Sequence, residues 1–171
     1  MTQLILGGAR SGKSALAERL ASQTKMPVTY IATATADDEE MRQRISHHQQ
    51  QRPRSWQTVE CPYDLSDTLR SRAKPDQCIL VDCLTLWLSN LLCAKHDTLA
   101  ARQTLLKTIT ELPGELIMVS NEVGLGITPM GELSRRFVDE SGRLHQALAQ
   151  HCERVIFTAA GLPLVMKGAT L

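Results

Sequence analysis

The sequence has 171 residues, of which 43% are hydrophobic and 22% are charged, proportions that suit one globular domain with a buried core. Nineteen basic residues against eighteen acidic ones leave a net charge of +1, which argues against nucleic acid as a main partner. No apolar run has the length needed to span a bilayer, and the first one enters the fold directly at Leu4–Leu6. We therefore expect a single domain over residues 1–171, with no membrane insertion and no signal peptide.

Strand-like apolar runs alternate with helix-like segments along the chain. The predicted strands are Leu4–Leu6, Val28–Ala32, Ile79–Val81, Leu116–Val119 and Val155–Thr158. The helix-like segments between them are Lys13–Thr24, Asp37–Gln50, Leu84–Leu92, Leu99–Leu112 and Gly131–His151. This alternation predicts an α/β domain with a mostly parallel sheet and helices on both faces. A last edge strand at Leu162–Val165 is weakened by Pro163, which cannot donate a ladder hydrogen bond.

A phosphate-binding motif lies between the first strand and the first helix. Gly7 and Gly12-Lys13-Ser14 complete the pattern G-x-x-x-x-G-K-[ST], and the alternative is a glycine turn with no ligand. The glycines let backbone N–H groups turn toward an anion, and the start of the helix adds the positive end of its dipole. With the alternating elements, this motif predicts a P-loop NTPase-like (RecA-like) fold. The predicted nucleotide-binding residues of the loop are Gly7, Gly8, Ala9, Arg10, Ser11, Gly12, Lys13 and Ser14.

Lys13 and Ser14 have separate predicted roles, and an aspartate completes the second one. Lys13 would contact the β- and γ-phosphates, and the Ser14 hydroxyl would help to hold Mg²⁺. Asp82 follows the apolar run Ile79–Val81, where a buried parallel strand would end at the carboxyl edge of the sheet. Ser14 and Asp82 therefore form the predicted Mg²⁺ site. The alternative is that Asp82 caps the helix that starts at Leu84.

The segment Asp37–Gln50 contains a pair of histidines. Met41, Ile45 and His48 fall at i, i+4 and i+7 and so share one helix face, whereas His47 lies about 100° round the helix. A histidine on an apolar stripe is more often a core or cleft residue than a nucleophile. This segment, however, follows the second strand, whose carboxyl end lies on the same edge as the phosphate-binding loop. Neutral imidazole is a competent nucleophile toward an activated phosphate, so His48 is a candidate for that role.

The cysteines show no pattern typical of disulfides or of a zinc site. Their number is odd and no Cys-x-x-Cys pair occurs, so we expect neither disulfides nor a structural zinc site. They fit core or surface positions in a protein of the reducing cytoplasm. They are Cys61, Cys78, Cys83, Cys93 and Cys152.

Seven blocks of the sequence, in their order, resemble one enzyme family. The blocks are GGARSGKS, YIATA, DDEEMRQRISHHQQQRP, W…TVE, VDCLTLWLSNLL, SNEVGLGITP and FVDESGRLHQALA. Together they resemble the bifunctional adenosylcobinamide kinase / adenosylcobinamide-phosphate guanylyltransferase of cobalamin biosynthesis, over nearly the whole chain. The histidine pair and the NEVG run are not features of P-loop proteins at large, whereas the stretch from Cys93 to Gly114 is not distinctive.

The resemblance implies two reactions. The family phosphorylates the aminopropanol hydroxyl of adenosylcobinamide with ATP or GTP, and then transfers GMP from GTP to that phosphate through a guanylyl-histidine. The product is adenosylcobinamide-GDP, in the assembly of the nucleotide loop of adenosylcobalamin. Carried over by position, the resemblance implies His48 as the nucleophile, with Lys13 beside the polyphosphate, and a homotrimer. Further nucleotide contacts would fall on Ala32, Thr33, Ala34, Gln49, Gln50, Gln51, Arg52, Glu60 and Asp82.

Three questions stay open at the level of sequence. The general base for the substrate hydroxyl is not determined, with Glu60, Asp82 and Glu122 as candidates. Asn121 and Glu122 follow an apolar strand at the same edge, where they either order a loop or act in catalysis. The rival functions are a simple P-loop small-molecule kinase without a covalent intermediate and a nucleotide-dependent regulatory module.

Overall fold

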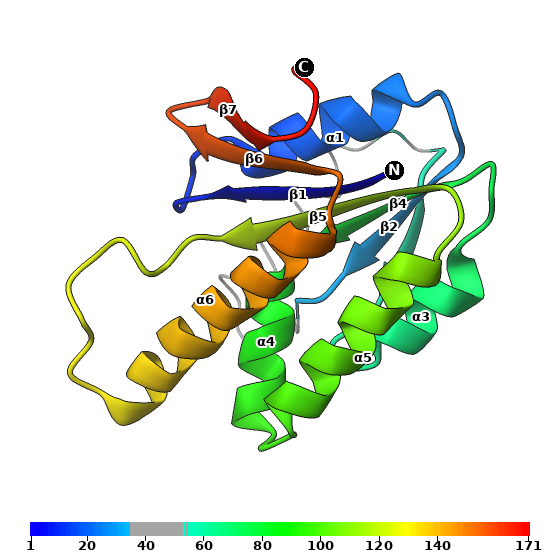
Figure 1. The fold of residues 1–171 in the computed structure, drawn as a ribbon. Helices are drawn as coiled ribbons and strands as arrows, with labels where there is room; N and C mark the ends of the chain where they lie inside the picture. The colour runs from blue at the N-terminus through cyan, green and yellow to red at the C-terminus, as the bar shows by residue number, and fades with distance from the viewer. Residues whose placement is uncertain (35–52, 54) are drawn as a thin grey trace.

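The computed structural model describes residues 1–34, 53 and 55–171. Seven strands form one sheet in the order β3-β2-β4-β5-β1-β6-β7 (Figure 1). Every neighbouring pair is parallel except β6 and β7, which are antiparallel. The strands are β1 Thr2–Gly7, β2 Val28–Ala32, β3 Gln57–Glu60, β4 Cys78–Asp82, β5 Glu115–Asn121, β6 Arg154–Ala159 and β7 Leu162–Lys167.

Helices cover both faces of the sheet, as the alternating sequence pattern predicted (Figure 1). One face carries α1, and the other carries α3, α4, α5 and α6. The helices are α1 Lys13–Gln23, α3 Leu65–Arg72, α4 Leu84–Cys93, α5 Thr98–Glu111 and α6 Glu132–His151. The mostly parallel α/β arrangement and the P-loop NTPase-like fold class are therefore confirmed.

The strand β1 shows how the sequence builds two cores. Successive side chains of a strand point to opposite faces. Leu4 and Leu6 accordingly pack into the cluster beneath α4 and α6, whereas Ile5 packs into the cluster beneath α1. All three side chains are buried, which is why this run is apolar at every position rather than alternating.

Two elements were not predicted from the sequence. The strand β3 is short and three of its four residues are exposed, so it has no apolar run to mark it. The helix α3 did carry a signal, because Leu65 and Leu69 are buried one turn apart. The edge strand containing Pro163 is confirmed as β7, where Pro163 lies opposite Thr158. The predicted helix at Asp37–Gln50 lies outside the described residues.

The parallel register gathers the ends of the central strands at one edge. Gly7, the last residue of β1, lies opposite Asn121 of β5 on one side and Thr158 of β6 on the other. The amide of Glu122 donates a hydrogen bond of 2.9 Å to the carbonyl oxygen of Gly7. Asp82 ends β4, the strand on the far side of β5. The chain that follows β5 and the chain that follows β6 therefore start beside the P-loop, and Asp82 lies one strand further away.

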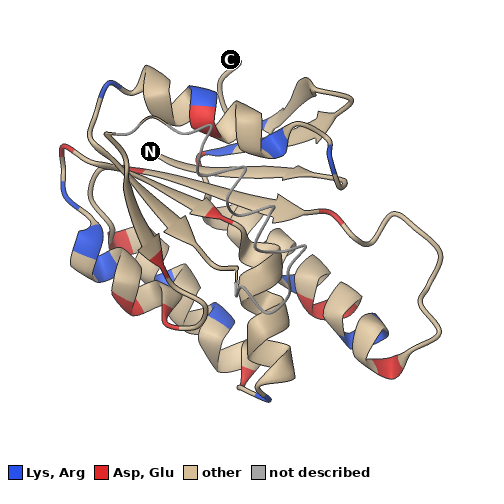
Figure 2. Ribbon diagram, turned by 180° about the vertical axis from the view of Figure 1, so that it is seen from behind, with Lys and Arg blue, Asp and Glu red and all other residues tan. Residues whose placement is uncertain are grey.

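Both signs of charge occur on four of the described helices, whereas α4 carries no charged residue. Basic and acidic residues are interspersed along α1, α3, α5 and α6 (Figure 2). None of the helices in the described ranges is long and apolar enough to cross a bilayer.

Candidate active site

The loop from Gly7 to Lys13 has the geometry of an anion cradle. The helix α1 starts at Lys13, and its N-cap residue Gly12 has φ 95°, a left-handed conformation that favours glycine. The first hydrogen bond of the helix runs from the Leu16 amide to the Gly12 carbonyl. The preceding amides at the start of the helix have no carbonyl one turn back, so they remain available to a ligand.

Neighbouring backbone allows only glycine at the first position of the motif. A Cβ atom added to Gly7 would lie 2.2 Å from the carbonyl oxygen of Thr158 and 2.7 Å from Oγ of Ser11. The turn between β6 and β7 also supports the loop, because the Gly161 amide donates to the Ser11 carbonyl at 2.9 Å. This second support was missed at the sequence level, since Gly161 lies 150 residues away along the chain and carries no motif.

Lys13 lies inside the loop rather than in solvent. Its Nζ atom donates to the Gly8 carbonyl at 2.6 Å and lies 3.5 Å from Oγ of Ser11, and the residue is 6% exposed. Burial lowers the pKa of Lys13, and the negative charge of Asp82 opposes that shift. The amine is thus held where phosphate oxygens would replace the loop carbonyl as its partner.

Ser14 and Asp82 fit a magnesium site in their donor chemistry. Both offer oxygen atoms, and Mg²⁺ takes one or two protein oxygens together with waters and phosphates. No group of three or more His, Cys, Asp or Glu side chains suited to a metal occurs among residues 1–34, 53 and 55–171. The residue that caps α4 is Cys83, and no side chain caps that helix within the same ranges. The capping alternative for Asp82 therefore has no support.

Thr33 is fully buried, and its hydroxyl and carbonyl groups have partners in the protein. Its hydroxyl donates to the Cys83 carbonyl at 2.6 Å and accepts from the Cys83 amide at 3.0 Å. Its carbonyl accepts from Asn90 at 2.9 Å. These bonds fix the ends of β2 and β4 to each other, so a nucleotide contact at Ala32–Ala34 would have to use other atoms.

Glu60 is exposed and ends β3, at the edge of the sheet. Between β3 and the P-loop strand β1 lie β2, β4 and β5. Four spacings of about 4.8 Å put the two strands roughly 19 Å apart. The structure therefore brings Asp82 and Glu122 near the loop and leaves Glu60 at a distance from it. His47, His48, Gln49, Gln50, Gln51 and Arg52 lie outside the described residues.

A buried polar network beside the loop was missed at the sequence level. Nε2 of His145 lies 2.7 Å from Oγ of Ser120, and Nδ1 of His145 lies 3.3 Å from a carboxylate oxygen of Glu122. Oγ of Ser120 lies 3.2 Å from Oγ1 of Thr85, which accepts from the Asn121 amide at 2.6 Å. The sequence offered one signal for it: His145 interrupts the apolar face of α6, between the buried residues 144 and 148.

Four of the five cysteines are buried thiols. All five are free, and Cys93 alone among them is exposed. Burial raises the pKa of Cys61, and it raises those of Cys78 and Cys83 to about 11 and that of Cys152 to about 12. Four thiols are thus protonated at neutral pH, as the prediction of core positions requires.

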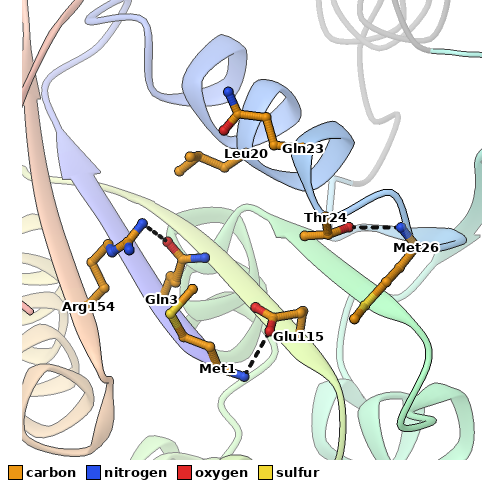
Figure 3. Close-up of a pocket in the computed structure, with 8 residues that line it drawn as sticks. All are labelled: Met1, Gln3, Leu20, Gln23, Thr24, Met26, Glu115 and Arg154. Carbon is orange, nitrogen blue, oxygen red and sulfur yellow. Dashed lines mark hydrogen bonds and ion pairs between the residues drawn. The ribbon is translucent and has the colours of Figure 1, made fainter. Parts of the chain in front are cut away.

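A surface hollow lies at the opposite edge of the sheet, where the strands begin (Figure 3). Its lining includes Gln3 at the start of β1, Glu115 at the start of β5 and Arg154 at the start of β6. It contains no residue of the P-loop. In open parallel sheets ligands bind outside the carboxyl ends of the strands, so we place the active site at the other edge.

The fold, together with the P-loop at the carboxyl edge of the sheet, defines a P-loop NTPase-like nucleotide-binding protein. A family model described as cobinamide kinase / cobinamide phosphate guanyltransferase matches residues 3–166. The chain therefore belongs to the cobinamide kinase / cobinamide phosphate guanyltransferase family, which is a family of enzymes.

Two curated relatives match along their whole length. The chain is 59% identical to a Pseudomonas aeruginosa protein named bifunctional adenosylcobalamin biosynthesis protein CobP, over 100% of both chains. It is 37% identical to the Salmonella typhimurium bifunctional adenosylcobalamin biosynthesis protein CobU, over 98% of this chain and 100% of the relative. A solved structure from Pyrococcus horikoshii OT3 covers 99% of this chain and 87% of its own, with a TM-score of 0.59 and 10% identity. This last similarity supports the fold alone.

Proposed function

We propose that this protein phosphorylates adenosylcobinamide and then transfers GMP from GTP to the product, giving adenosylcobinamide-GDP. The observation that carries the proposal is the complete phosphate cradle, with Lys13 inside it, in a chain that matches this family over residues 3–166. The names of the relatives place them in adenosylcobalamin biosynthesis, which agrees with a corrinoid substrate.

The kinase step needs positioning and charge neutralisation rather than a covalent group. The amides of the loop and Lys13 would hold the β- and γ-phosphates of ATP or GTP. Ser14 and Asp82 would hold Mg²⁺, which would neutralise further charge on the polyphosphate. The hydroxyl of the substrate then attacks the γ-phosphorus, and the nucleoside diphosphate leaves.

The transfer of GMP needs a nucleophile that is also a good leaving group. Imidazole is both, so we propose that His48 attacks the α-phosphorus of GTP and displaces pyrophosphate. The phosphate of adenosylcobinamide phosphate then takes GMP from the phosphoramidate. His48 is proposed from the sequence and the resemblance, since it lies outside the described residues.

A product assay tests the proposal. Purified protein is given adenosylcobinamide, ATP, GTP and Mg²⁺, and the corrinoid products are identified by mass spectrometry. We expect adenosylcobinamide phosphate first and adenosylcobinamide-GDP second. Phosphorylation without any GDP product would favour the simple kinase. Slow nucleotide hydrolysis that adenosylcobinamide does not stimulate would favour the regulatory module.

We also propose that the protein is cytoplasmic and that it forms a trimer. A cytoplasmic location fits the free cysteines, because thiols persist where the environment is reducing. A trimer follows from the resemblance, and light scattering of the purified protein would test it.

A further inference from the structure

The donor and acceptor of each hydrogen bond in the buried network beside the P-loop can be assigned. The Asn121 amide can only donate, so Oγ1 of Thr85 accepts from it at 2.6 Å and has its own proton available for Ser120. Ser120 in turn donates to Nε2 of His145 at 2.7 Å. The ring proton of His145 then sits on Nδ1, where it points at Glu122. The opposite direction would aim a lone pair of the ring at a carboxylate oxygen.

Burial keeps this ring in the form that the network requires. His145 is 5% exposed, Ser120 is 1% exposed and Thr85 is 8% exposed. Burial lowers the pKa of His145, and the charge and hydrogen bond of Glu122 oppose that shift. A neutral ring can accept from Ser120 and donate to Glu122 at the same time, whereas a doubly protonated ring could only donate.

The carboxylate of Glu122 is held at both of its oxygens. Oε1 accepts from the Gly124 amide at 2.6 Å, and Oε2 accepts from the His145 ring at 3.3 Å. The backbone amide of Glu122 donates to the Gly7 carbonyl at 2.9 Å, so the residue is fixed to the first glycine of the cradle. Its side chain remains 21% exposed, which leaves it open to a substrate and to water.

The other two carboxylates proposed for proton transfer fit less well. Glu60 lies on β3, with three strands between it and β1, and is roughly 19 Å away from that strand. The negative charge of Asp82 interacts with the positive charge of Lys13. Asp82 is also proposed to hold the metal, a role that uses its lone pairs. Glu122 lies on the chain directly after β5, the strand next to β1.

We propose that Glu122 accepts the proton of the attacking hydroxyl in the phosphoryl transfer, and that His145 is a positioning residue that holds this carboxylate through its Nδ1–H. The inference rests on the kinase step of the proposed function. The alcohol oxygen forms a bond to the γ-phosphorus while the bond from that phosphorus to the β–γ bridging oxygen breaks. The nucleoside diphosphate leaves with that electron pair, the proton passes to Glu122, and water takes it up afterwards.

The substitution Glu122→Gln tests the acceptor and keeps the shape of the side chain. Glu111→Gln is the matched control, because Glu111 is exposed at the end of α5, near the edge where β5 begins. Phosphorylation of adenosylcobinamide is measured alongside GMP transfer to adenosylcobinamide phosphate that is supplied ready-made. We expect kcat for phosphorylation to fall by about 10²- to 10⁴-fold in Glu122→Gln, with GMP transfer unchanged in both variants.

The other outcomes of this experiment would overturn either the role of Glu122 or the proposed function. A Glu122→Gln protein that phosphorylates as fast as Glu111→Gln would overturn the inference, and so would an equal loss of both reactions. A protein that phosphorylates no adenosylcobinamide even in its unaltered form would overturn the proposed function itself.

Two substitutions of His145 separate positioning from packing. The amide nitrogen of Asn takes the place of Nδ1, whereas that of Gln takes the place of Nε2. We therefore expect His145→Asn to keep most of kcat and His145→Gln to lose as much as Glu122→Gln, with the KM for ATP unchanged in both. Thermal unfolding checks that both variants are folded. Equal kcat values in the two folded variants would overturn the positioning role.

Discussion

The amine of Lys13 donates a hydrogen bond of 2.6 Å to the carbonyl oxygen of Gly8, so the lysine is folded back onto its own loop. Burial lowers the pKa of Lys13, and the negative charge of Asp82 is the larger of the two charges that oppose this shift. The amine therefore points into the loop, at the proposed phosphate site. A nucleotide then only needs to replace one oxygen partner by another.

Lys13→Ala should abolish phosphorylation of adenosylcobinamide, because the transferred phosphoryl group loses its principal cation. The measurement is the rate of label transfer from γ-labelled ATP to the corrinoid. Lys107→Ala, which removes an exposed lysine of α5, serves as the control and should keep the full rate. Near-normal phosphorylation by folded Lys13→Ala would show that the cradle does not hold the reacting phosphate.

A second prediction concerns the first glycine of the loop. In Gly7→Ala the new Cβ would meet the Thr158 carbonyl at 2.2 Å, so the free energy of unfolding should fall by about 1–3 kcal/mol. Gly142 is the matched control, because it lies within α6 and a Cβ there meets nothing within 4 Å. Gly142→Ala should raise the free energy of unfolding by about 0.5–1 kcal/mol. Urea unfolding measures both, and a Gly7→Ala protein as stable as the unaltered one would contradict the packing described for the loop.

Asp82→Asn should raise the Mg²⁺ concentration needed for half-maximal phosphorylation and lower the maximal rate. The reason is that an amide oxygen is a weaker ligand for a hard cation than a carboxylate. Asp76→Asn, at an exposed turn before β4, should leave the Mg²⁺ titration unchanged. An unaltered titration in Asp82→Asn with full activity would remove Asp82 from the metal site.

The sequence predicted the parts of this molecule that depend on local patterns. Strand β1, the loop and α1 follow from an apolar run and one glycine motif. The apolar run before Asp82 likewise predicted that this residue ends a strand. The sequence did not decide whether Glu122 orders a loop or acts in catalysis, because its partner His145 comes 23 residues later, on α6. Gly161 supports the loop through a contact that no local pattern encodes. Such long-range contacts depend on register and packing, which a single sequence does not reveal.

The buried His145 should make stability depend on pH. Its pKa is lowered below the ordinary value of 6.5, so the unfolded chain binds a proton that the folded protein excludes. The free energy of unfolding should therefore rise with pH between the lowered value and 6.5, and it should fall as the solution is acidified below 6.5. Urea unfolding of the unaltered protein and of His145→Asn at several pH values measures this. Identical pH dependence in the two proteins would mean that His145 does not contribute.

The histidine pair offers the most direct test of the two-reaction account. The protein is incubated with α-labelled GTP and Mg²⁺, and any labelled residue is mapped by mass spectrometry. We expect a covalent GMP on His48 that is lost in acid and kept in base, as for a phosphoramidate. His48→Ala should take up no label and make no adenosylcobinamide-GDP, yet still phosphorylate adenosylcobinamide, whereas His47→Ala should keep measurable labelling. A label on His47 would contradict the assignment of the nucleophile, and the absence of any adduct in active protein would contradict the guanylyltransferase half of the account.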